Sequence, residues 1–423
     1  MPAPWSRKLT RRAVLGAAAA AVAAPAAAAR LDLRVLYTDP QLLKPIHEEI
    51  ARRYMAAHPD IAVKLEVVAD YSAALQRVLR DAVTGQLPDV AFHGHNNIGL
   101  LAQQGLLASL DGLITAERDW QARGYSERLN AIGRVGNSVF ALPFALSTMV
   151  VMYNIDLVRA AAADPTQLPT TWDELFSLAR RIKATSGGIY IRIESPGSWG
   201  LNTLVQNFGG RVLTADLRDI AFDGPEGLAA MRLLRTYGEA RGSAALTGAQ
   251  ARQAFGAGTL GVLIDSSSGL RGYERAAGGR FEVRATLLPK VAGVAARIPP
   301  AGNSACIMTK DVVRRTAAWD YVKFATAPEA QTLIATEAAF VPMNTQAIAR
   351  EDLLGAFYRS RPNDRVAVDI LPMLEGWPSF PGPNSLRIDR DILEQMDAVV
   401  RLQKAPEAAL AEMARLARAQ LPK

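Results

Sequence analysis

The sequence predicts an α/β protein built as two lobes rather than as one compact domain. A chain of 423 residues is longer than a single hydrophobic core normally supports. Strand patterns alternate with helical patterns in two separate stretches, which is typical of βαβ units and a mainly parallel sheet. No Gly/Ser-rich linker separates the stretches, so we expect the chain to cross between the lobes more than once.

The first stretch opens with a strand over residues 31–37, where apolar and polar residues alternate. A helix is expected over 42–57, because apolar residues recur at nearly 3.6-residue spacing up to the breaker at His58-Pro59-Asp60. The next expected elements are a strand over 61–68, a helix over 71–83 and a short strand over 89–92.

The second stretch begins with strands near 139–143 and 149–153. Thr171 and Glu174 form the capping-box pair that opens the next helix. The remaining patterns are mostly helical, and the expected elements are a strand at 260–264 and helices at 201–209, 225–241, 247–256, 313–326, 328–337, 351–358, 388–403 and 406–420.

The first 29 residues have the composition of an export signal. Arg7, Lys8, Arg11 and Arg12 precede an Ala-rich apolar run that ends in small residues at 26–29. The arginine pair and the weak hydrophobicity favour the twin-arginine route, with cleavage near Ala29. The run of 17 residues is at the short limit for a membrane anchor. We therefore expect a cleaved signal and a soluble periplasmic protein.

Composition excludes several functional classes. With 49% hydrophobic and 21% charged residues the chain has the make-up of a folded soluble protein. The leader holds +4 of the formal charge of +7, and the other 394 residues carry 44 basic and 41 acidic side chains, which argues against a nucleic-acid partner. The single cysteine, Cys306, excludes a disulfide framework and a Cys-based zinc site.

Three patterns that suggest enzyme chemistry fit structural roles better. The GxGxxG at 256–261 would bind a dinucleotide only between a strand and a helix, whereas here a helix precedes it and a strand follows. His93 and His95 lack the third ligand that a zinc site needs. The serines at 266–268 and Ser304 have no nucleophile elbow around them. We expect no catalysis, no metal and no cofactor.

Four loops point instead to a ligand cleft, although each also fits an ordinary turn or cap. Trp199 follows Pro196-Gly197-Ser198 just before a helix, where a core tryptophan would be poorly surrounded. Residues 265–269 follow a strand and offer hydroxyls and free backbone N–H groups that suit an anion. Residues 299–304 form a hinge-like connector, and residues 380–387 deliver Arg387 from a rigid turn.

The mature chain resembles the extracellular solute-binding proteins of ABC importers over essentially its whole length. The resemblance rests on the segments Thr84-Gly85-Gln86-Leu87-Pro88-Asp89-Val90, Leu142-Pro143-Phe144 with Tyr153-Asn154, Thr171-Trp172-Asp173-Glu174-Leu175 and Phe340-Val341-Pro342-Met343-Asn344. It implies the two-lobe periplasmic-binding-protein fold, with hinge crossovers and a ligand cleft between the lobes. The implied first lobe is 31–146 completed by 303–348, and the second is 147–302 completed by 349–423.

Within that family the spacing of Trp199, the serine run, Gly302 and Arg387 is most similar to the members that bind glycerol 3-phosphate. In those proteins an arginine, serine hydroxyls and a glycine N–H hold the phosphate. The residues that the resemblance implies for this role are Arg387, Ser147, Ser267 (or Ser268, one residue on) and Gly302. Tyr71 and Trp199 match the aromatic walls.

Two positions depart from the pattern. His95 stands where those proteins have a glutamate, and Phe340 where they have a tyrosine. A neutral imidazole accepts one hydroxyl where a carboxylate accepts two, and a lost phenol hydrogen bond costs about 0.5–1.5 kcal/mol. A retained phosphate end and a remodelled polyol end favour a glycerophosphodiester or another phosphorylated polyol.

The resemblance therefore implies the monomeric binding component of an ABC importer. It would capture a glycerol-3-phosphate-like or glycerophosphodiester ligand and deliver it to a membrane permease served by a separate ATPase. A neutral sugar or oligosaccharide is the alternative ligand. An exported hydrolase that uses His95 and a serine is a third hypothesis, of a different class.

Overall fold

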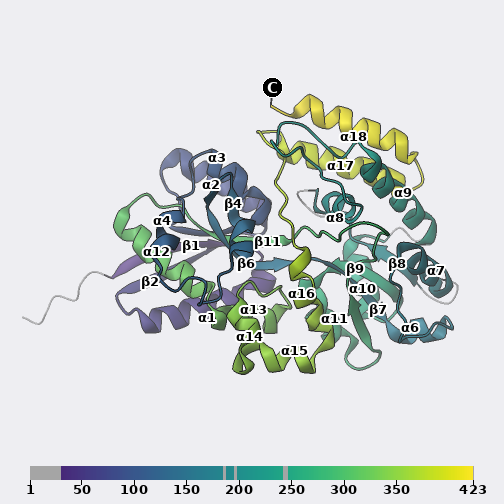
Figure 1. Cartoon of the computed structure of the whole chain (residues 1–423), viewed down its shortest axis with the longest axis horizontal. Helices are drawn as coiled ribbons and strands as arrows, with labels where there is room; N and C mark the ends of the chain where they lie inside the picture. Colours follow the sequence, from purple (N-terminus) through teal and green to yellow (C-terminus); the bar gives the residue numbers. More distant parts are fainter. Residues whose placement is uncertain (1–29, 184–186, 195–197, 242–245, 423) are drawn as a thin grey trace, which may run out of the picture.

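The computed structural model describes residues 30–183, 187–194, 198–241 and 246–422, so the expected export signal lies outside the described residues. Two β-sheets, each covered by helices, form the centres of two lobes that lie next to each other (Figure 1). In the part of the chain so described, no helix combines the length and apolar character needed to cross a bilayer.

The first lobe contains a five-stranded sheet in the order β2-β1-β3-β11-β6. Its strands are β1 (Leu31–Tyr37), β2 (Ile61–Val67), β3 (Val90–Gly94), β6 (Ala141–Ser147) and β11 (Ala301–Ile307). Its helices are α1 (Pro40–Ala57), α2 (Tyr71–Thr84), α3 (Ile98–Gln103), α4 (Asp111–Ala116), α5 (Glu127–Asn130), α12 (Val312–Ala325), α13 (Pro328–Ala338) and α14 (Thr345–Ala349), with the short ribbon β4 (Arg134–Val135) and β5 (Ser138–Val139).

Alternating side chains of this sheet supply two separate cores. Val35 and Phe92 face α1, α12 and α13, where Tyr54 and Tyr321 are fully buried. Leu36, Ala91 and Cys306 point the other way and pack on α2 and α3. Cys306 is buried as its apolar neighbours predict. The lobe is therefore a sheet between two helical layers.

The second lobe contains a four-stranded sheet in the order β10-β7-β9-β8. Its strands are β7 (Met149–Asn154), β8 (Gly187–Ile191), β9 (Leu260–Ser266) and β10 (Val283–Thr286). Its helices are α6 (Ile155–Ala160), α7 (Trp172–Lys183), α8 (Trp199–Asn207), α9 (Pro225–Ala240), α10 (Gly248–Gly256), α11 (Leu270–Ala277), α17 (Ser385–Val400) and α18 (Pro406–Gln420).

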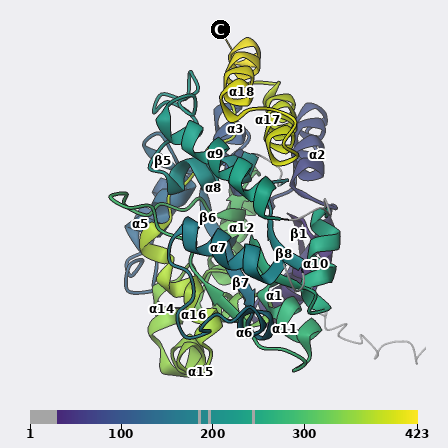
Figure 2. The same cartoon turned by 90° about the vertical axis from the view of Figure 1, so that its right-hand side faces the viewer.

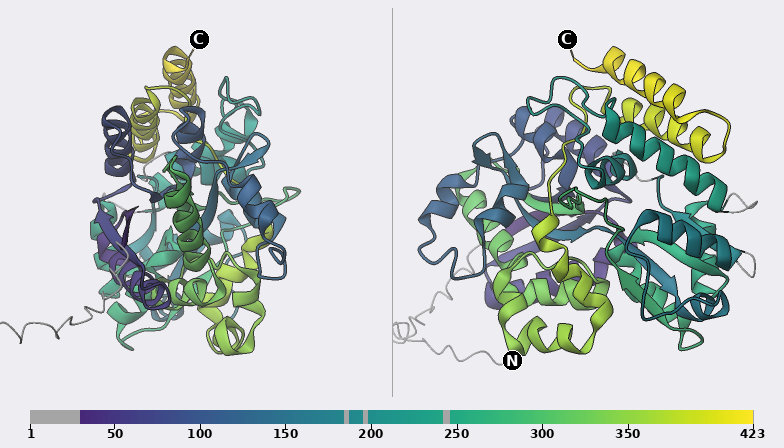
Figure 3. Two further views of the ribbon diagram at one scale, coloured as in Figure 1. Left: turned by 90° about the vertical axis from the view of Figure 1, so that its left-hand side faces the viewer. Right: turned by 45° about the vertical axis from the view of Figure 1, so that its right-hand side comes forward.

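Helices cover both faces of this second sheet. One face packs on α7, α8 and α9, which stand in front of the strands in Figure 2. The C-terminal helices α17 and α18 lie against α9 and extend the same core (Figure 3, right). The opposite face packs on α10 and α11. Both lobes thus share one three-layer design, although they differ in sheet order.

Both sheets are mixed, so the prediction of mainly parallel sheets is wrong. The parallel pairs are β1 with β2, β1 with β3 and β8 with β9. Every antiparallel pair of the two sheets contains β7 or β11. These are the strands that enter their sheet directly from the other lobe, and their direction is set by the crossing rather than by a right-handed βαβ turn.

The chain crosses between the lobes three times. Only Thr148 separates β6 from β7, a longer connector joins β10 to β11, and the third crossing leads from α14 towards α17. The third crossing holds η5 (Glu351–Gly355), α15 (Ala356–Ser360), α16 (Pro362–Asp369) and η6 (Leu371–Met373). Leu354 and Tyr358 pack with Ala335 and Ala347, so the start of the segment 349–423, assigned to the second lobe, contacts α13 and α14 instead.

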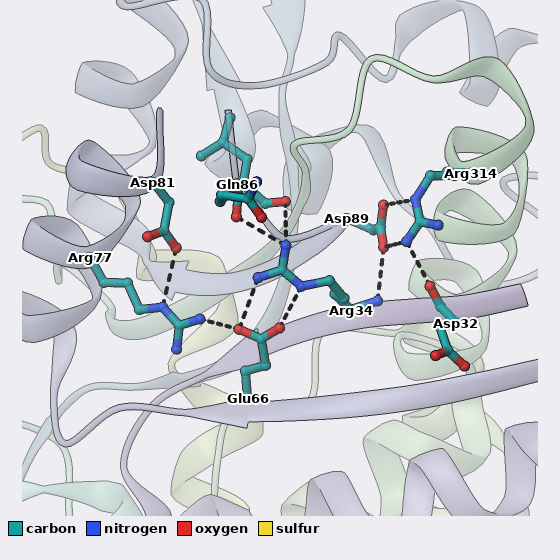
Figure 4. Close-up of polar contacts among 9 residues, drawn as sticks. Asp32, Arg34, Glu66, Arg77, Asp81, Gln86, Asp89 and Arg314 are labelled. Atoms are coloured by element: carbon teal, nitrogen blue, oxygen red, sulfur yellow. Dashed lines mark hydrogen bonds and ion pairs between the residues drawn. The ribbon is translucent and has the colours of Figure 1, made fainter. Parts of the chain in front are cut away.

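An ion-pair network fastens the first sheet to helices on its two sides (Figure 4). The Arg34 guanidinium on β1 donates to Glu66 on β2 at 2.7 Å, and Arg77 on α2 pairs with the same Glu66 carboxylate. The buried Asp89 accepts from the Arg34 backbone N–H at 2.8 Å and from Nε of Arg314, on α12, at 2.7 Å. All of these charges are paired within the lobe, which indicates a structural role.

Two local predictions about helix ends are confirmed. Thr171 Oγ1 accepts from the Glu174 N–H at 3.4 Å, and Glu174 Oε2 accepts from the Thr171 N–H at 3.1 Å, which completes the capping box. The GxGxxG segment ends α10 at Gly256 and leads into β9 at Leu260. It therefore terminates a helix and does not start one.

Candidate functional site

A cavity of about 360 Å³ lies between the lobes. Its size falls near the lower end of the roughly 300–1,000 Å³ found for small-molecule sites. Its walls include Asp39, Asp70, Tyr71, His95, Asn96, Asn97, Ser147, Arg192, Trp199, Ser266, Ser268, Pro300, Gly302, Phe340, Trp377, Ser385, Leu386 and Asp389. Many of these residues directly follow the carboxyl ends of β1, β3, β8 and β9, where open α/β sheets bind their ligands.

Two tryptophans, both hydrogen-bonded to the connector that leads to β11, form rigid apolar walls. Trp199 Nε1 donates to the Pro299 carbonyl and Trp377 Nε1 to the Pro300 carbonyl, each at 2.9 Å. Both indoles are almost fully buried. Because two consecutive carbonyls hold the indole N–H groups, the rings are fixed before any ligand arrives, which lowers the entropic cost of binding.

Two further aromatic residues come from the first lobe. Tyr71 begins α2, and its hydroxyl accepts from Asn303 Nδ2 at 3.2 Å. Burial raises the pKa of Tyr71 to about 12, so the phenol stays neutral. Phe340 follows α13 and is buried. Together with the indoles, these rings offer faces that suit the C–H surfaces of a ligand.

Three serine hydroxyls form a cluster at the end of β9. Ser266 Oγ lies 2.9 Å from Ser147 Oγ and 2.8 Å from Ser268 Oγ. Ser267 points away from the cavity, because its Oγ accepts from the Thr148 N–H at 3.4 Å and its own N–H donates to the Thr148 carbonyl. Of the two serines that sequence left open, Ser268 lines the cavity and Ser267 does not.

Carboxylates outnumber cations at the cavity wall. Asp39, Asp70 and Asp389 all line it, whereas Arg192 alone of the described lining residues carries a positive charge. Arg192 Nη1 is already bound to Asp265 Oδ1 at 3.0 Å, and Asp265 is buried and also accepts from Tyr273 at 2.7 Å. His95 adds no charge, because burial lowers its pKa to about 4.

Asp389 is the most perturbed of these carboxyls. Its Oδ1 accepts from Ser198 Oγ at 2.6 Å, and desolvation raises its pKa to about 7. A carboxyl group whose pKa lies near 7 can take either role in a hydrogen bond to a ligand hydroxyl: it accepts when ionised and donates when protonated. Asp39 also has a raised pKa, mainly through desolvation.

The pH dependence of stability tests this description of Asp389. The folded protein holds the proton up to about pH 7, while an unfolded carboxyl loses it near pH 4, so the free energy of unfolding falls as pH rises between these values. We expect Asp389→Asn to raise the melting temperature at pH 8 and to leave it nearly unchanged at pH 4. Glu394→Gln on the exposed face of α17 is the control, and an equal effect of Asp389→Asn at both pH values contradicts the prediction.

A family comparison fits this geometry. The sequence model described as bacterial extracellular solute-binding protein matches residues 39–332, well over half of the chain. The chain belongs to this family. Its two-lobe α/β fold is the one that solved solute-binding proteins share.

Curated relatives of this solute-binding protein include sugar binders. It is 27% identical over 182 residues to a maltotriose-binding protein of Pyrococcus abyssi, a match that covers 43% of this chain and 37% of that one. It is 26% identical over 211 residues to a lactose-binding protein of Rhizobium radiobacter, covering 49% of each. The chain thus spans about half, or less, of the length of the curated relatives it matches.

Solved structures of similar fold bind different classes of ligand. The cyclic α-maltosyl-1,6-maltose binding protein from Arthrobacter globiformis superposes with a TM-score of 0.78, at 20% identity, over 92% of this chain and 98% of that chain. UgpB from Mycobacterium tuberculosis, in complex with glycerophosphocholine, gives 0.79 at 20% identity and the same coverage. At this identity the likeness concerns the fold alone.

Six of the eight residues proposed from sequence meet in the cavity of this solute-binding protein. They are Tyr71, His95, Ser147, Trp199, Gly302 and Phe340. Ser267 is hydrogen-bonded to Thr148, and Arg387 is exposed on the first turn of α17, so neither belongs to the lining. His93 is buried in β3, and no group of three or more His, Cys, Asp or Glu close enough to bind a metal occurs among the described residues.

The cavity is also lined by Asp39, Arg192, Trp377 and Asp389, to which no sequence motif points. Trp377 lies in a coil with no periodicity, and Arg192 follows the short strand β8, which was not predicted. Asp389 lies two residues after Arg387, at the start of the helix predicted over 388–403, whereas Arg387 ends the turn predicted over 380–387. The direction of the α17 helix decides which of the two faces the ligand.

Proposed function

We propose that this protein is the ligand-capturing component of an ABC importer and that its ligand is a neutral sugar or oligosaccharide. The supporting observation is the chemistry of the cavity wall, where two anchored indoles stand among carboxyl, amide and hydroxyl groups. Sugars present C–H faces to aromatic rings and hydroxyls to such acceptors. An excess of carboxylates over cations disfavours an anionic ligand.

Binding would act through closure of the lobes. A ligand that contacts residues of both lobes binds the closed form better and shifts the population towards it. The closed protein would then dock on a membrane permease, and a separate ATPase would drive release. In this proposal the protein is a monomer, performs no chemistry on the ligand, binds no nucleic acid and reaches the periplasm through a cleaved twin-arginine signal.

A thermal-shift screen followed by calorimetry tests the ligand class. Maltodextrins, lactose and related sugars are compared with glycerol 3-phosphate and glycerophosphocholine on the purified protein. We expect at least one sugar to raise the melting temperature and to bind, and to be recovered intact after long incubation. Binding of the phosphorylated compounds alone would overturn the proposal.

A glycerophosphodiester is the second candidate. The Ser147, Ser266 and Ser268 hydroxyls together with Arg192 favour it, since hydroxyls and a guanidinium can surround a phosphate. The neutralisation of Arg192 by Asp265 weighs against it. The same screen separates the two candidates.

Two arginine variants sharpen the assignment of the site. We expect Arg387→Ala to change the affinity for the bound ligand by less than twofold, because Arg387 is exposed outside the cavity. Arg192→Ala should weaken binding about tenfold, as expected for the loss of a charged hydrogen-bond donor. Calorimetry on both variants measures the ligand affinity. A large loss of affinity in Arg387→Ala with none in Arg192→Ala would contradict the prediction.

A further inference from the structure

A second cavity of about 350 Å³ lies within the second lobe. It is bounded by the end of β8 and the residues that follow it, the end of α9, the start of α10 and the later turns of α17. None of its described lining residues belongs to the first lobe or lines the ligand cavity. Its volume is close to the 360 Å³ of the ligand cavity, so it can hold a molecule of similar size.

Apolar side chains form much of the wall of this second cavity. They are Ile191, Ile193, Leu246, Leu393 and Val400, together with the rings of Tyr190 and Tyr237. Both tyrosines are buried. A ligand that covers this surface removes apolar area from water, which favours an occupant with an apolar body.

The six charged residues of the wall differ in how they are paired. Arg401 Nε lies 2.6 Å from Asp397 Oδ2, and Arg390 Nε lies 3.8 Å from Glu394 Oε1. Each pair joins residues four apart on α17 and carries no net charge. One acid and one arginine of the wall remain.

The remaining acid, Glu194, already has partners. Its carboxylate accepts from the Tyr190 hydroxyl, and burial together with this bond raises the pKa of Tyr190 above its usual value. It also lies at the start of α10, where a Cβ on Gly248 would come within 2.0 Å of Glu194 Oε1. The first N–H groups of a helix have no partner inside the helix, so they favour a nearby carboxylate. Glu194 therefore does not require a cation from a ligand.

The remaining arginine, Arg241, has no counter-charge. It forms no ion pair with a carboxylate of the described residues, and its buried Nε has no hydrogen-bond partner among them. Segments 195–197 and 242–245, which neighbour the cavity in sequence, contain no acidic residue. The guanidinium lies near the Tyr237 hydroxyl, which stays neutral because burial raises the pKa of Tyr237 to about 12. A half-buried guanidinium without an anion is a binding group for a carboxylate.

We propose that this cavity is a second ligand site and that it binds a small organic acid, with the carboxylate on Arg241 and the apolar body against the aliphatic wall. This inference goes beyond the proposed function and does not depend on it. Because every described lining residue belongs to the second lobe, movement of the lobes relative to each other leaves the site intact. An occupant would stabilise α17, whose first turn carries Asp389 of the ligand cavity.

Matched pairs of acids and alcohols test the ligand class. The probes are 3-phenylpropionate and hexanoate, each compared with the alcohol of the same apolar body, in ligand-observed NMR titrations and thermal-shift measurements at neutral pH. We expect at least one acid to bind and to raise the melting temperature. Its alcohol should bind about tenfold more weakly or less, because a charged hydrogen bond to the guanidinium is missing.

Four variants locate the bound acid. Arg241→Gln should weaken binding of the acid at least tenfold and leave binding of the alcohol unchanged, whereas Arg241→Lys keeps the charge and should retain part of the affinity. Arg235→Gln is the matched control, because Arg235 is exposed on the same helix and pairs with Glu239 at 3.0 Å. Arg192→Ala removes the cation of the ligand cavity and should not change the affinity for the acid.

The outcomes that overturn the second site are distinct from those of the sugar screen. Absence of binding by both acids, equal affinity of acid and alcohol, or an equal effect of Arg241→Gln and Arg235→Gln contradicts it. A loss in Arg192→Ala with none in Arg241→Gln places the acid in the ligand cavity and also overturns it. In each of these cases the proposed function still stands or fails by the sugar screen alone.

Discussion

Replacing Trp377 by alanine is expected to weaken sugar binding about 30-fold, equivalent to roughly 2 kcal/mol, a typical cost for truncating a buried aromatic anchor. The indole is 5% exposed, lines the ligand cavity, and is oriented by its hydrogen bond to Pro300. Its removal takes away an apolar wall of the cavity and the hydrogen bond to the Pro300 carbonyl. Calorimetry with the sugar found in the screen measures the loss.

Two matched variants separate the role of the ring from that of the hydrogen bond. Trp377→Phe keeps most of the apolar surface but has no N–H, so we expect a loss smaller than that of alanine. Trp120→Phe is the control, because Trp120 packs with Tyr125 and Trp319 in the core of the first lobe. Equal affinity of wild type and Trp377→Ala would show that the ring does not contact the ligand.

Gly302→Ala is expected to produce the largest loss of stability, about 3 kcal/mol or more. Gly302 has a φ of +111°, which side chains rarely adopt, and a Cβ at this position would lie 2.0 Å from the Ala145 carbonyl oxygen. The backbone of β11 or β6 must shift to relieve this clash. Because Gly302 also lines the cavity, ligand affinity should fall together with the denaturation midpoint.

A second glycine provides the control for this variant. Gly272 is exposed on α11, and a Cβ there would meet nothing within 4 Å. Gly272→Ala should leave stability unchanged or raise it by about 0.5–1 kcal/mol, since alanine favours a helix interior. A loss in Gly302→Ala no larger than the change in Gly272→Ala would contradict the argument from φ and close approach.

The spacing of apolar residues predicted most helices, because each of these helices turns one apolar face towards a core. The predicted helices at 225–241 and 406–420 correspond to α9 and α18 within a residue at each end. The strand β11 was interpreted instead as a connector over 299–304. Gly302, Asn303 and Ser304 lie in the half of β11 that is nearer the cavity. None of them is a large apolar residue, so this half lacks the continuous apolar pattern that predicts a central strand.

The site was predicted in part, for a geometric reason. The hydroxyl-bearing segment at 265–269, at the end of β9, could be placed at the cleft from its position after a predicted strand, whereas His95 was placed there by the family resemblance. Arg387 could not, because α17 begins at Ser385 and each helical residue turns by about 100°. Arg387 is therefore rotated by about 200° around the helix axis from Ser385. Ser385, Leu386 and Asp389 line the cavity, and Arg387 does not.

The position of β11 has a consequence for biosynthesis. This strand separates β3 from β6 in the first sheet, yet the ribosome makes it only after every strand of the second sheet. A nascent chain that ends before Ala301 carries two unpaired strand edges in the middle of the unfinished sheet, which are open to aggregation. The second lobe is also unfinished at that point, because α17 and α18 of its core come later still, so we expect truncations before Ala301 to leave both lobes unfolded.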